Sequence, residues 1–134
     1  MAAVVIDTDI LSFRFKKDSR ARLYRKHLVG RDWVLSFMTL AELDLWANTH
    51  NWGSDRRAKL ELFLGSYAVL YPDRDVCRLW AEVSDGARRN GRPIECADAW
   101  IATTALALGV GLVTHNPADY LGVNGLTVFS EATT

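Results

Sequence analysis

The chain of 134 residues has little cysteine and no long uninterrupted apolar run. Cys77 and Cys96 stand alone without CxxC spacing. This argues against a disulfide framework or a zinc site and favours two free, buried thiols in a reducing cytoplasm. The most apolar stretch, residues 99–118, is broken by glycines, a histidine, an asparagine and a proline, so we expect no membrane span. The amino terminus lacks a signal-peptide pattern, because Asp7 and Asp9 follow only a short apolar run.

The chain also lacks internal repeats, low-complexity tracts and any segment that reads as a linker between domains. About 15 kDa of protein in which 49% of the residues are hydrophobic is enough for one proper core. We therefore expect residues 1–134 to form a single domain.

Short apolar segments alternate with helical patterns along the chain. Strands are expected at residues 2–6, 33–36, 67–70, 111–114 and 126–129. Helices are expected from Thr8 or Asp9 to about residue 15, and then at residues 19–29, 39–48, 54–65, 74–90 and from about 95–97 to 109. This alternation predicts an α/β fold with three layers, in which helices cover both faces of a mostly parallel sheet of four to five strands.

The formal net charge is zero, but the charges are unevenly distributed. Eight lysine and arginine residues lie between Arg14 and Arg31, and Asp18 is the only acid among them. A stripe of this kind can bind phosphates, although a solvated helix face explains it as well. Arg22 and Arg25 are the members that we expect to contact nucleic acid.

Two acids stand in apolar surroundings. Asp98 is the only formal charge between residues 96 and 118, and Asp7 directly follows the apolar run that forms the first expected strand. A carboxylate removed from water costs several kcal/mol unless a cation, a metal ion or hydrogen bonds compensate it. Because the sequence offers Asp98 no obvious lysine or arginine, a divalent metal ion is the leading candidate.

Other polar residues can join these two acids at the carboxyl edge of a parallel sheet, where ligands gather. Glu42 begins a helix, but it could equally complete a capping box with Thr39. Asp119 and Asn116 follow the expected strand at residues 111–114, where a solvated loop acid and a turn-forming asparagine are the simpler interpretations. If the acids converge, hard oxygen ligands favour Mg²⁺ or Mn²⁺, and such a site can hydrolyse phosphodiesters.

Four segments resemble the successive motifs of PIN-domain ribonucleases, most closely the VapC toxins of bacterial toxin–antitoxin pairs. They are Val5-Ile6-Asp7-Thr8-Asp9-Ile10-Leu11-Ser12, Thr39-Leu40-Ala41-Glu42-Leu43, Asp98-Ala99-Trp100-Ile101-Ala102 and the stretch from Leu112 to Tyr120. The likeness covers essentially the whole chain, in the family's order and spacing. The family's metal-binding and catalytic acids carry over to Asp7, Glu42 and Asp98. The fourth position is open between Asn116 and Asp119, and we assign it to Asp119.

The resemblance implies a PIN fold and Mg²⁺-dependent endoribonuclease activity, with Mn²⁺ as a substitute. Structured RNA, such as tRNA or rRNA, is the expected substrate, so that cleavage inhibits translation. Thr8, Asp9, Thr114 and Asn116 are expected to support the metal-binding acids through hydrogen bonds. The resemblance also implies a homodimer without membrane contact, neutralised by a cognate VapB-like antitoxin. Because an acidic active site repels RNA, we expect arginines and lysines of the basic stripe to lie at its rim and offset that repulsion.

Two other classes of function compete with this interpretation. Asp7-Thr8-Asp9 after a strand is also similar to the first motif of aspartate-based phosphatases, and a strand-end aspartate is typical of phosphate-accepting receiver domains. Both classes need a later lysine, and the chain has none after Lys59. A PIN-like module that binds RNA or protein and cleaves weakly or not at all is the other alternative.

Overall fold

The computed structural model describes residues 2–133. Within them, five strands form one parallel sheet in the order β3-β2-β1-β4-β5. The strands are β1 Ala3–Ile6, β2 Asp32–Ser36, β3 Ala68–Leu70, β4 Gly111–Val113 and β5 Val128–Phe129. The helices are α1 Thr8–Phe15, α2 Arg25–Leu28, α3 Phe37–Thr49, α4 Ser54–Leu64, α5 Arg74–Arg89 and α6 Cys96–Leu108, with 3-10 helices η1 Ser19–Tyr24 and η2 Pro117–Tyr120. The expected three-layer α/β fold is confirmed.

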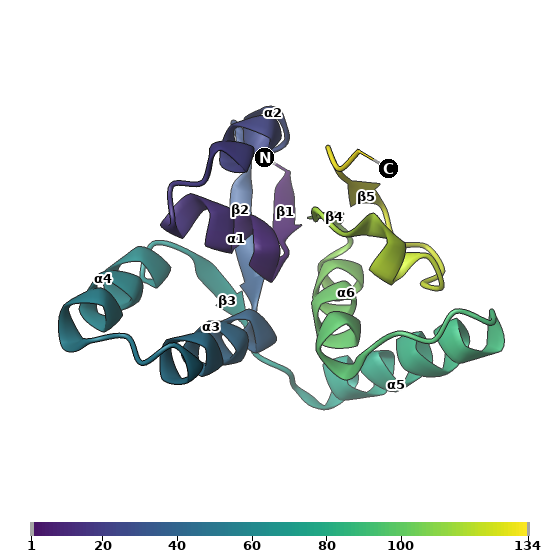
Figure 1. The fold of residues 1–134 in the computed structure, drawn as a ribbon. Coiled ribbons are helices and arrows are strands. Elements are labelled where there is room, and N and C mark those ends of the chain that lie inside the picture. Colours follow the sequence, from purple (N-terminus) through teal and green to yellow (C-terminus); the bar gives the residue numbers. More distant parts are fainter. Residues whose placement is uncertain (1, 134) are drawn as a thin grey trace.

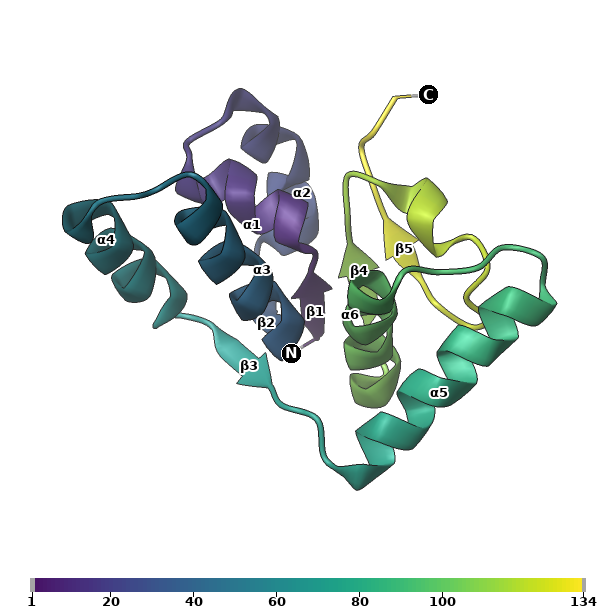
Figure 2. The ribbon, with the colours of Figure 1, turned by 60° about the horizontal axis from the view of Figure 1, so that its bottom comes forward.

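The order of the strands explains the layers. From β1 the chain moves outward through β2 to β3, and it then returns across the sheet to β4 and β5 on the other side of β1. Because parallel connections are right-handed, this change of direction places the later helices on the opposite face. Figures 1 and 2 show α1, α3 and α4 on one side of the sheet and α5 and α6 on the other.

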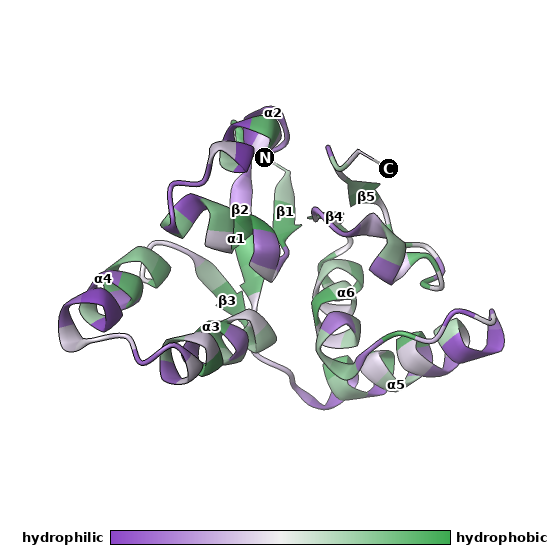
Figure 3. Cartoon of the chain, viewed as in Figure 1, coloured by the Kyte–Doolittle hydropathy of each residue, from purple (hydrophilic) through white to green (hydrophobic). Residues whose placement is uncertain are grey.

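Each face of the sheet buries its own hydrophobic cluster, because alternate strand residues point to opposite sides. Val4 and Ile6 of β1 pack with the residues of α1, α3 and α4, whereas Val5 between them packs with α5 and α6. Figure 3 shows the same division, with β1 and most of α6 hydrophobic and the exposed turns of α4 hydrophilic. β1 is therefore buried on both faces, and its carboxyl end is held rigidly between the two layers.

Several helices begin or wind differently from the sequence prediction. Asp7 is the N-cap of α1, so this helix begins at Thr8, whereas Ser36 rather than Thr39 caps α3. Asp7 directly follows β1 and Ser36 is the last residue of β2, so at both places the chain passes from strand to helix without a loop. The helix expected at residues 19–29 is instead η1 followed by the short α2. Most of that segment is exposed, and its buried residues are Tyr24 and Leu28, so it has no continuous apolar stripe that would hold one long helix against the core.

Two expectations about composition have different outcomes. Cys77 and Cys96 are both free thiols, as expected, but neither is fully buried: Cys77 is half-buried, and Cys96 is exposed because it opens α6 at the surface. Among residues 2–133, no helix combines the length and the apolar composition needed to cross a bilayer.

Candidate active site

The predicted acids meet in one pocket at the carboxyl ends of β1 and β4. This acidic pocket has a volume of about 320 Å³. Its lining residues are Asp7, Thr8, Asp9, Glu42, Leu45, Trp46, Asp98, Asn116 and Asp119. All four residues assigned as metal-binding acids are present, and Asp9 is a fifth carboxylate among them. They come from separate segments of the chain, so only the fold brings them together.

Asp7 lies at the centre of the hydrogen bonds around the pocket. Its Oδ1 accepts the backbone N–H of Thr8 at 2.7 Å, and its Oδ2 accepts the hydroxyls of Thr114 and Tyr120, each at 2.8 Å. The side chain is buried, with 7% of the residue exposed. Burial raises the pKa of Asp7 despite these three donors, and the nearby charge of Asp119 raises it further.

Glu42 is held by a pair of threonines that connects α1 to α3. The hydroxyl of Thr8 donates to Glu42 Oε1 at 2.7 Å and lies 3.0 Å from the hydroxyl of Thr39. With one hydrogen to give, Thr8 must accept from Thr39. Because α3 begins at Phe37, Glu42 lies in its second turn, and the capping-box interpretation is wrong. The pKa of Glu42 is raised, by burial first and by the charge of Asp7 second.

Asp9 faces the loop that follows β4. Its Oδ1 accepts the backbone N–H of Ile10 at 2.7 Å. Its Oδ2 accepts the backbone N–H of His115 and the side-chain N–H of Asn116, both at 3.0 Å. Burial and the charge of Asp7 raise the pKa of Asp9 to about 7. Asn116 thus supports a carboxylate of the pocket directly.

Asp98 is half-buried in the first turn of α6. Burial and then the charges of Asp7 and Asp119, with smaller effects from neighbouring glutamates, raise its pKa to about 7. Among residues 2–133, no lysine or arginine forms an ion pair with any acid of the pocket. None of the lining residues is basic, so nothing in the pocket could neutralise phosphate as an aspartate-based phosphatase requires.

The donor set suits a hard divalent cation. Carboxylate and amide oxygens are the ligands that Mg²⁺ and Mn²⁺ prefer. Burial first, and the charge of Asp7 as a smaller cause, raise the pKa of Asp9, Glu42 and Asp98, and a bound cation would offset both effects. In the described part of the chain, no three acidic, histidine or cysteine side chains already stand at the mutual spacing of metal ligands. Binding an ion would therefore require the less constrained carboxylates to rotate towards Asp7.

Comparison with known proteins identifies the arrangement. The model of the PIN domain family matches residues 4–119. The chain belongs to the PIN-domain family. It is of the VapC type: it is 33% identical to ribonuclease VapC1 of Haemophilus influenzae over 91% of this chain and 92% of that protein.

Two further relatives extend this PIN-domain likeness. The tRNA(fMet)-specific endonuclease VapC of Shigella flexneri is 28% identical, over 94% of this chain and 96% of that protein. The structure of VapBC-1 from nontypeable Haemophilus influenzae superimposes with a TM-score of 0.76 at 27% identity, covering 96% of this chain and 97% of that one.

The PIN pocket also has two supporting residues, Tyr120 and Thr39, whose contacts there the sequence did not predict. Tyr120 is buried, and its hydroxyl donates to Asp7 and lies 3.5 Å from Asp98 Oδ1. Burial and the two aspartates raise its pKa, so it stays a donor. The sequence signal that could have identified Tyr120 is its position directly after Asp119, at the end of the segment that resembles the last PIN motif. Thr39 was interpreted only as a cap, and its contact with Thr8 depends on the packing of α1 against α3.

Arg22 and Arg25 do not lie at the acidic pocket of this PIN domain. They line a separate hollow that shares no residue with it. Lys16 of the same stripe does lie at the rim, because its ammonium is 4.0 Å from the ring centroid of Trp46, a lining residue. The expectation that the basic stripe lies at the rim of the acidic pocket is therefore wrong for Arg22 and Arg25, whereas Lys16 does lie there.

Proposed function

We propose that this PIN-domain protein is a Mg²⁺-dependent endoribonuclease and the toxin of a toxin–antitoxin pair. The observation that carries the proposal is the convergence of five carboxylates in one pocket that contains no basic residue. Such an accumulation of like charge destabilises the fold unless a cation binds, so a function is the best physical explanation for its presence.

Asp7, Glu42, Asp98 and Asp119 would hold the ion. Asp7 is already oriented by three donors, and Thr8 aims Glu42 at the same pocket. When bound, Mg²⁺ supplies positive charge that favours ionised water and stabilises the leaving oxygen of a phosphodiester. Asp9 would hold the loop after β4 in place by accepting hydrogen bonds from His115 and Asn116. Tyr120 would orient Asp7 by donating its hydroxyl hydrogen to the carboxylate.

RNA is the proposed substrate, with structured molecules such as tRNA or rRNA as the targets. Two relatives support this: the Haemophilus protein is a ribonuclease, and the Shigella protein is a tRNA(fMet)-specific endonuclease. Cleavage of these targets would inhibit translation. We propose a cognate VapB-like antitoxin as the inhibitor, supported by the likeness to VapBC-1. A homodimer is the proposed assembly.

The test is incubation of purified protein with total tRNA and rRNA in Mg²⁺ or Mn²⁺, with and without EDTA. We expect endonucleolytic products that disappear with EDTA and with the Asp98→Asn variant, and we expect expression of wild type alone to arrest growth. Sequencing the ends of the products would identify the target. RNA binding without metal-dependent cleavage would instead favour the non-cleaving binding module.

A further inference from the structure

A second hollow lies at the opposite end of α1 from the acidic pocket. It has a volume of about 400 Å³ and is lined by Arg14, Ala21, Arg22, Arg25, Leu28, Val29 and Trp33. We call it the arginine hollow. Whereas α1 begins beside the acidic pocket, Arg14 lies in its last turn. Figure 1 shows α2, which begins with Arg25, beyond α1 and near the start of β2.

The charges of the arginine hollow are uncompensated. Among residues 2–133, Arg14, Arg22 and Arg25 form no ion pair, although Asp32 lies close by in the sequence. By contrast, four other arginines of the chain pair with aspartates: Arg20, Arg78, Arg88 and Arg89. The three arginines of the hollow thus stand together without a carboxylate partner among the described residues.

Aromatic groups hold Arg14 in place without neutralising it. Its guanidinium lies 4.2 Å from the ring centroid of Trp33, and its Nε donates to the hydroxyl of Tyr67 at 3.4 Å. Trp33 is fixed in turn, because its indole N–H donates to the carbonyl of Leu28 at 2.7 Å and its ring stacks on Tyr67. The result is a preorganised cation beside two exposed ones.

We propose that the arginine hollow binds the phosphate backbone of the RNA substrate, away from the cleavage point. Guanidinium groups match phosphate oxygens in a bidentate way, and three of them fit a run of phosphates better than a single small anion. An acidic pocket in a protein of zero net charge repels RNA, so the affinity must come from basic groups outside it. This inference rests on the proposed ribonuclease function.

The experiment measures RNA binding without cleavage. An Asp98→Asn background is combined with Arg22→Gln and Arg25→Gln, and binding of fluorescent tRNA is followed by anisotropy over a series of KCl concentrations. We expect about 5- to 30-fold weaker RNA binding at 0.1 M salt. The slope of log affinity against log salt concentration should become smaller by about one to two, because each lost phosphate contact releases about one counterion fewer on binding. The matched control is Arg88→Gln with Arg89→Gln on α5, which should bind like the background.

Equal affinity and slope in the two double variants would overturn the proposal. A second result would also overturn it: the Arg22 and Arg25 variant binds RNA normally but no longer associates with a co-expressed antitoxin encoded by a neighbouring gene. The hollow would then be a binding site for a protein partner. Failure of the proposed function is distinguishable, since it appears as absence of cleavage by wild type. All four arginine positions are exposed, and thermal melting should show unchanged stability.

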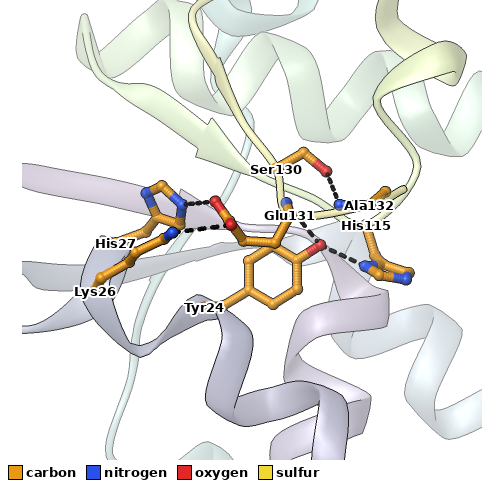
Figure 4. A network of polar contacts seen from close by, with 7 residues as sticks. All are labelled: Tyr24, Lys26, His27, His115, Ser130, Glu131 and Ala132. Atoms are coloured by element: carbon orange, nitrogen blue, oxygen red, sulfur yellow. Dashed lines mark hydrogen bonds and ion pairs between the residues drawn. The ribbon is translucent and has the colours of Figure 1, made fainter. Parts of the chain in front are cut away.

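An independent observation concerns the carboxyl-terminal segment, which Figure 4 shows beside the loop after β4. The carboxylate of Glu131 pairs with Lys26 at 2.9 Å and with His27 at 2.7 Å. Its backbone N–H donates to the hydroxyl of Tyr24 at 3.1 Å, and that hydroxyl also hydrogen-bonds His115 Nδ1. The Tyr24 hydroxyl therefore joins the backbone of Glu131 to the imidazole of His115, and the tautomer of His115 decides which of the two side chains donates.

The geometry points to Tyr24 as a positioning residue for the acidic pocket. Tyr24 is fully buried, and its ring and that of Phe13 pack at right angles against His115. The backbone N–H of the same His115 supports Asp9, beside the amide of Asn116. Fixing the imidazole therefore fixes the loop that orients a carboxylate of the pocket.

The test is Tyr24→Phe, which keeps the ring and removes the hydroxyl, with Tyr67→Phe as the matched control. We expect at least tenfold faster amide exchange at residues 115–116 and about three- to tenfold weaker Mn²⁺ binding by calorimetry, with the control unchanged in both. Glu131→Gln should also speed amide exchange at residues 115–116 and weaken Mn²⁺ binding, but by less than Tyr24→Phe. Reduced thermal stability of Tyr24→Phe with unchanged exchange and Mn²⁺ affinity would show a merely structural role and overturn the inference.

Discussion

Replacing Asp98 by asparagine separates the electrostatic cost of the pocket from its chemistry. Burial and neighbouring acids raise the pKa of Asp98 from 3.8 to about 7. Between these two values the folded protein holds a proton that the unfolded chain has lost. The contribution of Asp98 to stability is therefore fully present below about pH 4 and is lost as the pH rises to about 7. The asparagine side chain does not titrate, so the Asp98→Asn variant should be the more stable protein in neutral, metal-free solution.

The size of the effect follows from the pKa and the exposure. A pKa difference of about three corresponds to roughly 4 kcal/mol for a group removed from solvent. Asp98 is only half-buried, and solvent screening should leave about 1 kcal/mol. For a domain of this size that is a rise in Tm of about 3–4 °C.

The assay is thermal unfolding in EDTA at pH 8 and at pH 4.5. We expect Asp98→Asn to melt about 3–4 °C above wild type at pH 8 and nearly with it at pH 4.5. Millimolar Mg²⁺ should raise the Tm of wild type more than that of the variant, which should also fail to cleave RNA. Asp75→Asn is the matched control, because Asp75 also lies in the first turn of a helix but is 90% exposed.

Two results would refute this reasoning. A metal-free variant that melts below wild type at pH 8 would show that Asp98 is compensated within the protein. Full cleavage activity in Asp98→Asn would exclude the carboxylate as a ligand.

Three further predictions concern the surroundings of the pocket. Tyr120→Phe removes a buried donor to Asp7, so it should lower the free energy of unfolding by about 2 kcal/mol in denaturant and weaken Mn²⁺ binding at least tenfold. Unchanged Mn²⁺ affinity would contradict the role of Tyr120 in orienting Asp7. Thr103→Val removes a buried hydroxyl without a partner among the described residues and should stabilise the fold by up to about 1 kcal/mol without altering Mn²⁺ affinity; marked destabilisation would reveal a missed partner. Mn²⁺ affinity of wild type should rise about tenfold from pH 6 to pH 8, because protons on Asp9 and Asp98 oppose the metal; a flat calorimetric profile would argue against these carboxylates.

The fold could be predicted from the sequence because the local pattern of apolar residues matches the burial of each residue in the folded protein. Val4, Val5 and Ile6 are apolar in succession because β1 is buried on both faces, and that run identified the strand and the position of Asp7 at its end. Gly109 likewise ended α6 as predicted, and it adopts the left-handed conformation that favours glycine.

The errors arose where a local signal had a competing long-range explanation. Thr39 and Glu42 have capping-box spacing, yet Ser36 starts the helix and both residues face α1 instead. The role of Tyr120 requires η2 to lie beside Asp7, which local spacing does not reveal. The sequence shows that Arg22 and Arg25 are charged but not which way the fold turns them. The prediction therefore placed them at the acidic pocket, whereas they line a separate hollow.

The central claim is that the acids of the pocket bind one or more divalent cations together. Its most direct test is a crystal structure of the protein with Mn²⁺, in which anomalous scattering locates the ion. We predict a peak within coordination distance of carboxylate oxygens of Asp7 and Asp98 and of Glu42 or Asp119. A pocket without a peak in crystals grown at millimolar Mn²⁺, or a peak only at surface carboxylates elsewhere, would contradict it.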